Sequence, residues 1–149
     1  MSKLTLKQAD TIIDAALKEG RSRSLLPLAI AVLDAGGNMI ACKREDGAGI
    51  MRIDVASGKA WGSLGLGFGT REMAKRAATN PAFITTLAVA SEGRVLPSPG
   101  GCLILDHDGD VIGAVGISGD VGDNDELCAL AGITAAGFTG TGGDPASAA

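Results

Sequence analysis

Apolar residues recur along the chain at two different spacings, one typical of helices and one typical of strands. Five of them repeat at helical spacing near the N-terminus: Ala9, Ile12, Ile13, Ala16 and Leu17. Thr5 and Gln8 have the spacing of a capping box, in which each side chain bonds the other residue's backbone N–H. The pattern predicts a helix over about residues 5–19, with Gly20 as its C-terminal stop.

Two later stretches are apolar on both sides of a short polar turn. Residues 28–33 and 39–43 flank Asp34-Ala35-Gly36-Gly37, and residues 103–105 and 111–117 flank Asp106-His107-Asp108-Gly109. Asp can accept hydrogen bonds from the backbone just downstream, and Gly permits positive φ. Each stretch is therefore predicted to form a β-hairpin.

Helical spacing returns between the hairpins and after the second one. Residues 52–64, residues 70–78 and the segment after Asn80-Pro81 are predicted helices. A last helix is predicted to begin at Asp123. Four apolar residues are expected to face inward from it: Leu127, Leu130, Ala131 and Phe138.

The order helix, hairpin, helices, hairpin, helix is typical of an α+β fold, in which helices cover one antiparallel sheet. We expect a single domain over residues 1–138. Residues 139–149 are rich in Gly and Ala and offer nothing large to bury, so they are expected to form a flexible tail.

Composition narrows the classes of function. The chain has 149 residues, of which 46% are hydrophobic and 20% are charged, as in an ordinary globular domain. Its net charge of -4 offers no broad positive surface to a phosphate backbone, so no nucleic-acid partner is expected. No apolar run is long enough to span a bilayer, and no secretory signal follows Met1. We therefore expect no membrane association and a cytoplasmic location.

The residues most used for metal binding and nucleophilic catalysis are scarce. Cys42, Cys102 and Cys128 lie far apart, and the chain has one histidine, His107, and no tyrosine. A disulfide framework and a metal site are therefore not expected. His107 is expected to be exposed in its turn, and Cys102 is the thiol that we would suspect of reactivity.

Cationic residues gather after the first hairpin. Arg44 closes that hairpin, and Arg52 and Lys59 share one face of the helix predicted over residues 52–64. Two cations beside the loop Pro97-Ser98-Pro99-Gly100-Gly101 can hold a carboxylate or a propionate, with loop N–H groups as further donors. The alternative interpretation is a solvated helix face with ordinary surface ion pairs.

Several short motifs resemble the GlcG/HbpS family in their order and spacing. They are Leu4-Thr5-Leu6-Lys7-Gln8-Ala9, Ile30-Ala31-Val32-Leu33-Asp34-Ala35-Gly36-Gly37, Arg44-Glu45-Asp46-Gly47-Ala48, Lys59-Ala60-Trp61, Pro99-Gly100-Gly101 and Gly113-Ala114-Val115-Gly116-Ile117-Ser118-Gly119. The resemblance covers about residues 4–138. It implies a profilin-like or PAS-like α-β-α fold with a five-stranded antiparallel sheet, and it implies homo-oligomers.

The resemblance also makes haem a candidate cofactor. Some family members bind haem or take part in its degradation, others are fused to corrinoid adenosyltransferases, and many lie beside genes for glycolate or aromatic-compound catabolism. Haem iron is usually held by His, Cys, Met or Tyr. This chain has Gly37-Asn38 where the family commonly has Gly-Gly-His.

Three functions are compatible with these residues. The first, which we prefer, is an accessory small-molecule-binding protein of a catabolic pathway, with a pocket for an acidic or aromatic ligand, haem included. Its ligand-binding residues would be Arg44, Arg52, Lys59, Pro99, Gly100 and Gly101.

The second function is a metal-independent enzyme that acts on a carboxylated or aromatic intermediate. Asp54 or Glu126 would accept the proton, and Lys59 would serve as an electrostatic clamp. The third is an oligomeric scaffold without a ligand. The residues alone leave open whether the protein is an enzyme.

Overall fold

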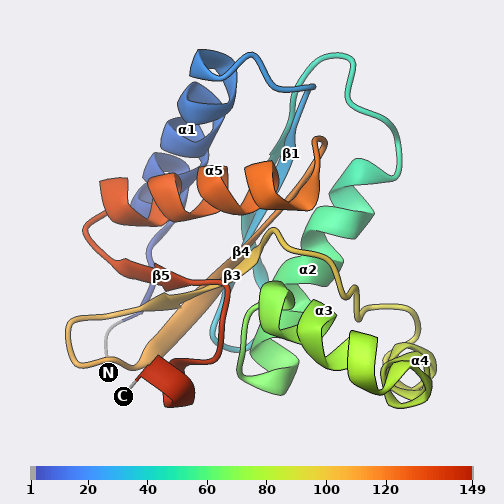
Figure 1. Ribbon diagram of the computed structural model, residues 1–149. Coiled ribbons are helices and arrows are strands. Elements are labelled where there is room, and N and C mark those ends of the chain that lie inside the picture. The colour runs from blue at the N-terminus through green and yellow to red at the C-terminus, as the bar shows by residue number, and fades with distance from the viewer. Residues whose placement is uncertain (1–2, 149) are drawn as a thin grey trace.

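The computed structural model describes residues 3–148, which form a five-stranded antiparallel sheet between two layers of helices (Figure 1). The strands are β1 (Ala29–Asp34), β2 (Met39–Arg44), β3 (Gly101–Leu105), β4 (Val111–Ser118) and β5 (Thr139–Thr141), in the order β2-β1-β4-β3-β5. The helices are α1 (Leu6–Ser22), α2 (Arg52–Leu66), α3 (Thr70–Thr79), α4 (Pro81–Ala90) and α5 (Gly122–Ala135). The predicted α+β fold of the α-β-α kind is confirmed.

Both predicted hairpins are present, and their turns use the expected chemistry. Strand β1 pairs with β2 and β3 pairs with β4, while β1 and β4 join the two hairpins at the centre of the sheet. Asp34 Oδ1 accepts from Gly36 N at 2.9 Å and from Asn38 N at 3.0 Å. Asp106 Oδ1 accepts from the backbone of the second turn in the same way. His107 is exposed there, as predicted.

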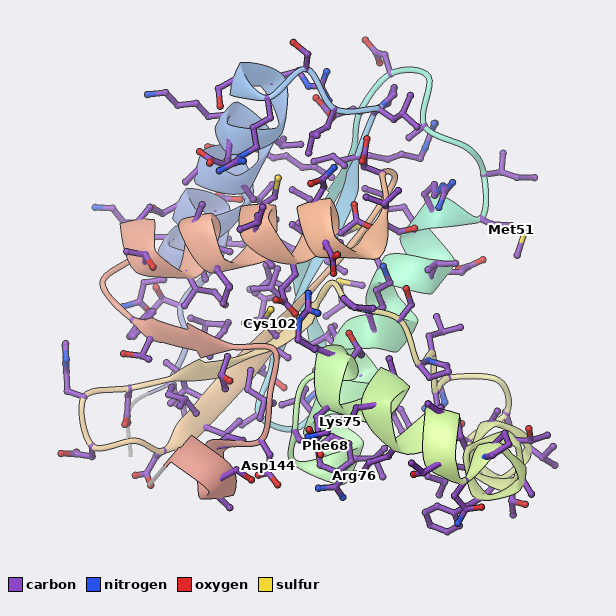
Figure 2. The ribbon with its side chains drawn as sticks, viewed as in Figure 1. Met51, Phe68, Lys75, Arg76, Cys102 and Asp144 are labelled. Carbon is purple, nitrogen blue, oxygen red and sulfur yellow. The ribbon has the colours of Figure 1, made fainter. Side chains whose placement is uncertain are left out.

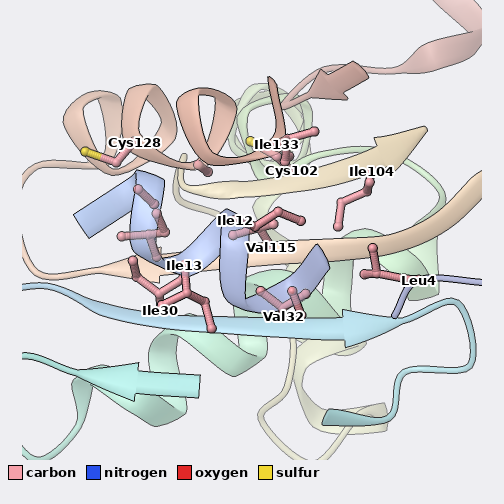
Figure 3. Close-up of a cluster of buried hydrophobic side chains, with 14 of the residues drawn as sticks. Leu4, Ile12, Ile13, Ile30, Val32, Cys102, Ile104, Val115, Cys128 and Ile133 are labelled. Atoms are coloured by element: carbon pink, nitrogen blue, oxygen red, sulfur yellow. The ribbon is translucent and has the colours of Figure 1, made fainter. Parts of the chain in front are cut away.

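The sheet buries apolar residues on both faces. Figure 3 shows Ile12 and Ile13 of α1 and Ile133 of α5 packed against one face, where Ile30 and Val115 meet them. On the other face, α2 packs against side chains that alternate with these along the strands, as the two-residue period of a strand requires. Helix α2 therefore covers most of the second face, and α3 and α4 lie beyond it (Figure 1).

Helix α1 begins as predicted and ends later than predicted. Gln8 N donates to Thr5 Oγ1 at 3.1 Å and Thr5 N donates to Gln8 Oε1 at 2.9 Å, which completes the capping box. Gly20 is a buried helical residue, so the prediction that it stops the helix is wrong. A Cβ at Gly20 would lie 2.6 Å from Leu28 Cδ1. Glycine therefore serves close packing at this position.

Helix α5 has a different start and a different buried stripe from those predicted. Val121 is the N-cap residue, and Asp123 lies inside the first turn. Leu127 is 43% exposed, whereas Cys128 and Ile133 are fully buried. The stripe is rotated because small residues of α5 allow α1 to approach closely. At Gly132 a Cβ would collide with the Ile12 carbonyl oxygen.

Helices α3 and α4 lie where the sequence predicts them, outside the main layers. The Asn80 side chain caps α4 by accepting from Phe83 N at 3.3 Å, and Pro81 occupies the first turn. Helix α4 has no charged residue, and Phe83 and Val89 are 55% and 76% exposed. None of the helices within residues 3–148 combines the length and the apolar content needed to cross a membrane.

The segment expected to be a flexible tail from residue 139 carries structure as far as residue 148. Strand β5 pairs with the edge of β3, and the 3-10 turn Pro145–Ala148 follows it. Gly69 N donates to the Gly143 carbonyl at 2.8 Å, and Arg76 Nη2 lies 3.2 Å from Asp144 Oδ2. Figure 2 shows Asp144, Arg76 and Phe68 together at this end of the molecule. Ala149 lies outside the described residues.

Candidate functional site

Helix α2 carries the candidate residues Arg52, Asp54 and Lys59, and its backbone lies directly on β4. Gly116 of β4 faces the Ala56 carbonyl oxygen so closely that a Cβ on Gly116 would collide with it. The close approach buries Lys59 and Ala60 on the inner side of the helix. Residues to either side of this contact line two separate hollows.

The smaller hollow, which we call the Lys59 cavity, has a volume of about 180 Å³. It lies between α2, the loop before β3, the end of β4 and the start of α5. The residues that line it are Arg52, Val55, Lys59, Leu96, Pro97, Ser98, Ser118, Asp120, Gly122 and Asp125. As predicted, Arg52 and Lys59 share one face of the helix.

Lys59 forms a buried ion pair with Asp125 of α5. Lys59 Nζ lies 3.2 Å from Asp125 Oδ2 and donates to the Ile117 carbonyl at 2.8 Å. The two side chains are 4% and 1% exposed. Burial lowers the pKa of the Lys59 amine and raises the pKa of the Asp125 carboxyl, and the attraction between them offsets only part of each shift. Desolvation therefore works against the charged form of both groups.

Asp120 fixes the other side of this pair. Asp120 N donates to Asp125 Oδ1 at 3.1 Å. The Asp120 carboxylate accepts from Asn124 Nδ2 at 2.7 Å, from Val121 N at 2.8 Å and from Leu26 N at 2.9 Å. These hydrogen bonds, that of Asn124 first, lower the pKa of Asp120. Both acids of the cavity already have donors of their own.

Arg52 is a cation with spare hydrogen-bond donors. Its Nη1 donates to Ser118 Oγ at 3.1 Å. Among residues 3–148, no carboxylate forms an ion pair with Arg52. A guanidinium has five N–H donors in a planar fork that matches a carboxylate. Arg52 is therefore a cation of the cavity that can bind an anion.

The loop Pro99-Gly100-Gly101 supports Lys59 from behind and does not line the cavity. A Cβ on Gly100 would lie 2.8 Å from Lys59 Nζ, and a Cβ on Gly101 would lie 2.5 Å from the Lys59 carbonyl oxygen. Glycine at both positions lets the loop press against the lysine. Pro97 and Ser98, at the start of the same predicted loop, line the cavity instead.

Arg44 lies apart from Arg52 and Lys59. Its Nη1 donates to the Ala48 carbonyl at 2.7 Å, and it borders a separate surface hollow with Arg21, Pro27, Glu45 and Asp46. The bend at residues 45–51 carries the chain away from the end of β2 before α2 begins. The structure thus separates Arg44 from the other predicted cations.

The two proposed proton acceptors also lie outside the Lys59 cavity. Asp54 is exposed in the first turn of α2 and borders the larger hollow. Glu126 pairs with Arg71 of α3 at 3.0 Å and packs against Gly142. Asp54, Glu126 and Lys59 therefore do not form one constellation.

Cys102 is a core residue. It lies in β3 under α5, with no exposed surface (Figures 2 and 3). Burial raises the pKa of the Cys102 thiol far above its usual range. The suspicion that Cys102 is reactive is therefore wrong. Within residues 3–148, no group of His, Cys, Asp and Glu is arranged to hold a metal ion.

The larger hollow, which we call the Trp61 hollow, has a volume of about 410 Å³ and lies on the neighbouring face of α2. Leu33, Met39 and Trp61 line it, together with Asp54, Glu92 and Arg94. The Arg94 guanidinium stacks on the indole at 3.9 Å. Sequence spacing did not predict this stack, because 32 residues and two helices separate Trp61 from Arg94.

Sequence reasoning also missed Asp125 as the partner of Lys59. The sequence offered one signal, a cluster of acids around the start of α5, but acids at this end of a helix are expected for capping and for the dipole. Only the packing of α5 across the end of β4 reveals which acid turns inward. Asp125 is buried, while its neighbour Asp123 is exposed beside Arg71.

Fold and site together define a small α-β-α domain with a polar cavity beside its central helix. The model of the HbpS-like haem degrading protein family matches residues 4–134, and the chain belongs to this family. A 15.0 kDa protein from the dhaT-dhaS intergenic region of Citrobacter freundii is 33% identical over 105 residues, which span 70% of this chain and 72% of that protein.

Solved structures show the same fold. The ORFY protein of Klebsiella pneumoniae is 28% identical with a TM-score of 0.81, over 92% of this chain and 93% of that one. A double mutant of HbpS from Streptomyces reticuli is 30% identical with a TM-score of 0.76, over 90% and 87%. A PduOC complex with haem has a TM-score of 0.83 over 92% and 97%, at 24% identity, which is a likeness of fold alone.

Proposed function

We propose that this protein binds a short carboxylic acid in the Lys59 cavity, as an accessory small-molecule-binding protein of a catabolic pathway. One observation carries the proposal: Arg52, without an ion-pair partner among the described residues, shares a small polar cavity with the buried amine of Lys59. The Arg52 fork provides the donors that a carboxylate needs.

The size of the cavity sets the size of the ligand. Its 180 Å³ correspond to about six water molecules in the liquid, because each takes about 30 Å³. Sites for drug-sized molecules usually begin near 300 Å³. The cavity therefore suits an acid of a few carbon atoms, such as a short hydroxy or oxo acid.

The unpaired guanidinium of Arg52 is the charge that a ligand carboxylate can meet in this cavity. The cavity holds two cations, Arg52 and Lys59, and two acids, Asp120 and Asp125. The acids accept hydrogen bonds from Lys59 and from backbone and amide donors that belong to the protein. A carboxylate that enters the cavity can therefore accept hydrogen bonds from the unused donors of Arg52 and from the Ser98 hydroxyl.

Thermal shift with short acids tests this proposal, because a ligand that binds only the native state raises its stability. Lactate and glycolate are expected to raise the Tm in proportion to the logarithm of their concentration, and added salt to weaken the effect. Arg52→Gln is expected to weaken binding about tenfold or more, since it removes a charge-assisted pair. Arg44→Gln is the matched control and should bind like the wild type. Equal binding by both variants would contradict the site.

Haem is the second candidate ligand, and it fits the other hollow better. The Trp61 hollow is the larger of the two, and Met39 provides there a thioether of the kind that can hold haem iron. Membership of the HbpS-like family and the likeness to a PduOC haem complex support this candidate. Asp54 and Glu92 in the same hollow disfavour haem propionates, which is why we place it second.

An absorbance titration with haemin tests the second candidate. A saturable Soret shift that is lost in Met39→Leu and kept in His107→Ala would support haem in the Trp61 hollow. His107 is the control because it lies in the exposed turn between β3 and β4, outside this hollow. A shift that both variants retain would place haem elsewhere on the protein.

A homo-oligomer, which the family resemblance implies, remains a proposal. The uncharged and exposed surface of α4, with Phe83 and Val89, is of the kind that subunit contacts cover. Light scattering of the wild type and of a Phe83→Lys variant is expected to show a smaller particle for the variant. The same mass for both would exclude α4 from the contact.

A further inference from the structure

The Lys59 amine is a buried nucleophile beside a cavity that is proposed to hold an acid. Of the chain's six lysines, Lys59 alone is buried, and the others are exposed: Lys3, Lys7, Lys18, Lys43 and Lys75. Burial and a nearby second cation both lower the pKa of a lysine. The neutral amine, which is the form that attacks carbonyl groups, is then easier to reach. Arg52 is that second cation.

We propose that Lys59 forms an imine with the carbonyl carbon of a short 2-oxo acid whose carboxylate is paired with Arg52. This inference rests on the acid binding proposed above and names its ligand class. The cavity that both side chains line limits the acid to a few carbon atoms. A 2-oxo acid has its carbonyl carbon directly next to its carboxylate, so one small molecule can reach both groups.

Asp125 supplies the proton transfers that the step needs. The Lys59 ammonium passes one proton to Asp125 Oδ2, 3.2 Å away, and becomes a neutral amine. The amine forms a C–N bond as the carbonyl π electrons move to oxygen. The nitrogen then gives up a second proton. The oxygen takes up these two protons, the first of them returned by Asp125, and leaves as water, so that the imine forms in its protonated state. One amine and one carbonyl give one imine and one water, and no oxidant or reductant is consumed.

The surroundings of Lys59 hold the amine in place before the attack. The Ile117 carbonyl accepts from Nζ at 2.8 Å, and the Gly100 backbone leaves no room for a side chain against it. When the imine is protonated, its positive charge lies opposite Asp125, so the buried pair keeps its charge balance. These contacts make Gly100 a positioning residue for the reacting amine, while Asp125 takes part in the proton transfers.

Reductive trapping tests the proposal on the intact protein. The wild type is incubated with pyruvate and cyanoborohydride, and the adduct is located by peptide mass spectrometry. The adduct at Lys59 is expected to exceed that at any exposed lysine about tenfold or more, because the acid is held beside the amine. Lactate has no carbonyl carbon of this kind and should leave no adduct. Equal labelling of Lys59 and of the exposed Lys75 would overturn the imine.

Two variants separate this inference from the proposed acid site. Lys59→Arg keeps a cation but has no amine that can form an imine, so it should give no adduct at residue 59. Arg52→Gln should reduce trapping about tenfold, in line with its loss of acid binding. If lactate stabilises the wild type while pyruvate leaves Lys59 unlabelled, the imine is wrong and the acid site stands. If neither acid binds or labels, both proposals fail. Peptide mass spectrometry of the labelled wild-type protein tests the imine even if Lys59→Arg does not fold.

Discussion

The two faces of α2 present opposite kinds of hollow within two helical turns. The Lys59 cavity is small, and it contains the buried ion pair between Lys59 of α2 and Asp125 of α5. The Trp61 hollow is more than twice as large, and its acids Asp54 and Glu92 are exposed around an indole that Arg94 covers. The difference shows that helical periodicity can place residues on a face, while the elements packed against that face decide their chemistry.

The consequence is a division of ligand types. A small cavity with a spare guanidinium selects a small anion, because few other groups satisfy Arg52 there. A larger hollow with a stacked indole accepts a flat apolar molecule, whose contact is largely with the ring. One helix can therefore serve two ligand classes without any shared side chain, and variants on each face should act independently.

The largest expected effect is the loss of one partner of the buried pair. Asp125→Ala should lower the free energy of unfolding by about 3–5 kcal/mol, because it leaves the Lys59 charge buried and unpaired. Asp54→Ala on the Trp61 side removes an exposed acid at a helix start and should cost about 0.3–1 kcal/mol. Urea unfolding measures both. If the two variants lower the free energy of unfolding by similar amounts, the contrast between the two faces of α2 is wrong.

A double variant tests whether the charged pair of Lys59 and Asp125 stabilises the fold. Lys59→Met with Asp125→Leu removes both charges and keeps apolar volume, so it should cost less than either single change. The expected sign follows from the pKa values, since burial lowers that of Lys59 and raises that of Asp125. A double variant that is less stable than Asp125→Ala would mean that the charged pair stabilises the fold.

The next effect concerns the contact that separates the two hollows. Gly116→Ala places a methyl group against the Ala56 carbonyl and should cost about 1–3 kcal/mol, because α2 must move off the sheet. Gly65→Ala is the matched control on α2, where a Cβ would make ordinary contact 3.7 Å from the Trp61 ring. That variant should gain about 0.5–1 kcal/mol through helix propensity. Thermal unfolding distinguishes the two signs.

A smaller effect is expected from the Arg94 stack. Arg94→Ala should cost about 0.5–1 kcal/mol, as for an exposed cation–π contact. Trp61 is the chain's single tryptophan, so its fluorescence emission reports this face directly. The emission should change in Arg94→Ala while lactate affinity stays that of the wild type. A large loss of lactate affinity would show that the two hollows are coupled.

The smallest expected effect is a pH dependence confined to the Lys59 side. Hydrogen bonds, first that of Asn124, lower the pKa of Asp120 below its usual 3.8. Its contribution to stability is therefore present above the unfolded pKa and is lost as pH falls through the lower folded pKa. Wild type and Asp120→Asn should differ in urea unfolding at pH 7 and converge in strong acid. A constant difference at every pH would exclude this role of the Asp120 charge.

Local chemistry explains which parts of the fold could be predicted from the sequence. The Asp34 and Asp106 turns depend on residues two to four positions apart, so their spacing revealed both hairpins. The shared face of Arg52 and Lys59 needs only the helical period. Strand β5 was missed because Thr139–Thr141 is short and forms only against the edge of β3. Gly140 fits there because Ile133 and Leu130 leave no room for a side chain.

Only half of the candidate site could be predicted from the sequence. The cations of α2 were found, but their acid partner comes from α5, 66 residues later in the chain. Such a pair depends on how α5 crosses the end of β4, which no local pattern encodes. Arg44 was grouped with Arg52 because the two are close in sequence, whereas the bend at residues 45–51 separates them. The glycines at 100 and 101 were found as neighbours of Lys59, and the structure gives them a packing role.

A crystal structure of the protein grown with lactate tests the acid site most directly. The expected result is one lactate in the Lys59 cavity, with its carboxylate paired to the Arg52 guanidinium and its remaining atoms beside Lys59 and Ser98. Arg52→Gln crystals grown in the same way should lack it. Lactate bound in the Trp61 hollow, or lactate in the Lys59 cavity with its carboxylate turned away from Arg52, would contradict the site.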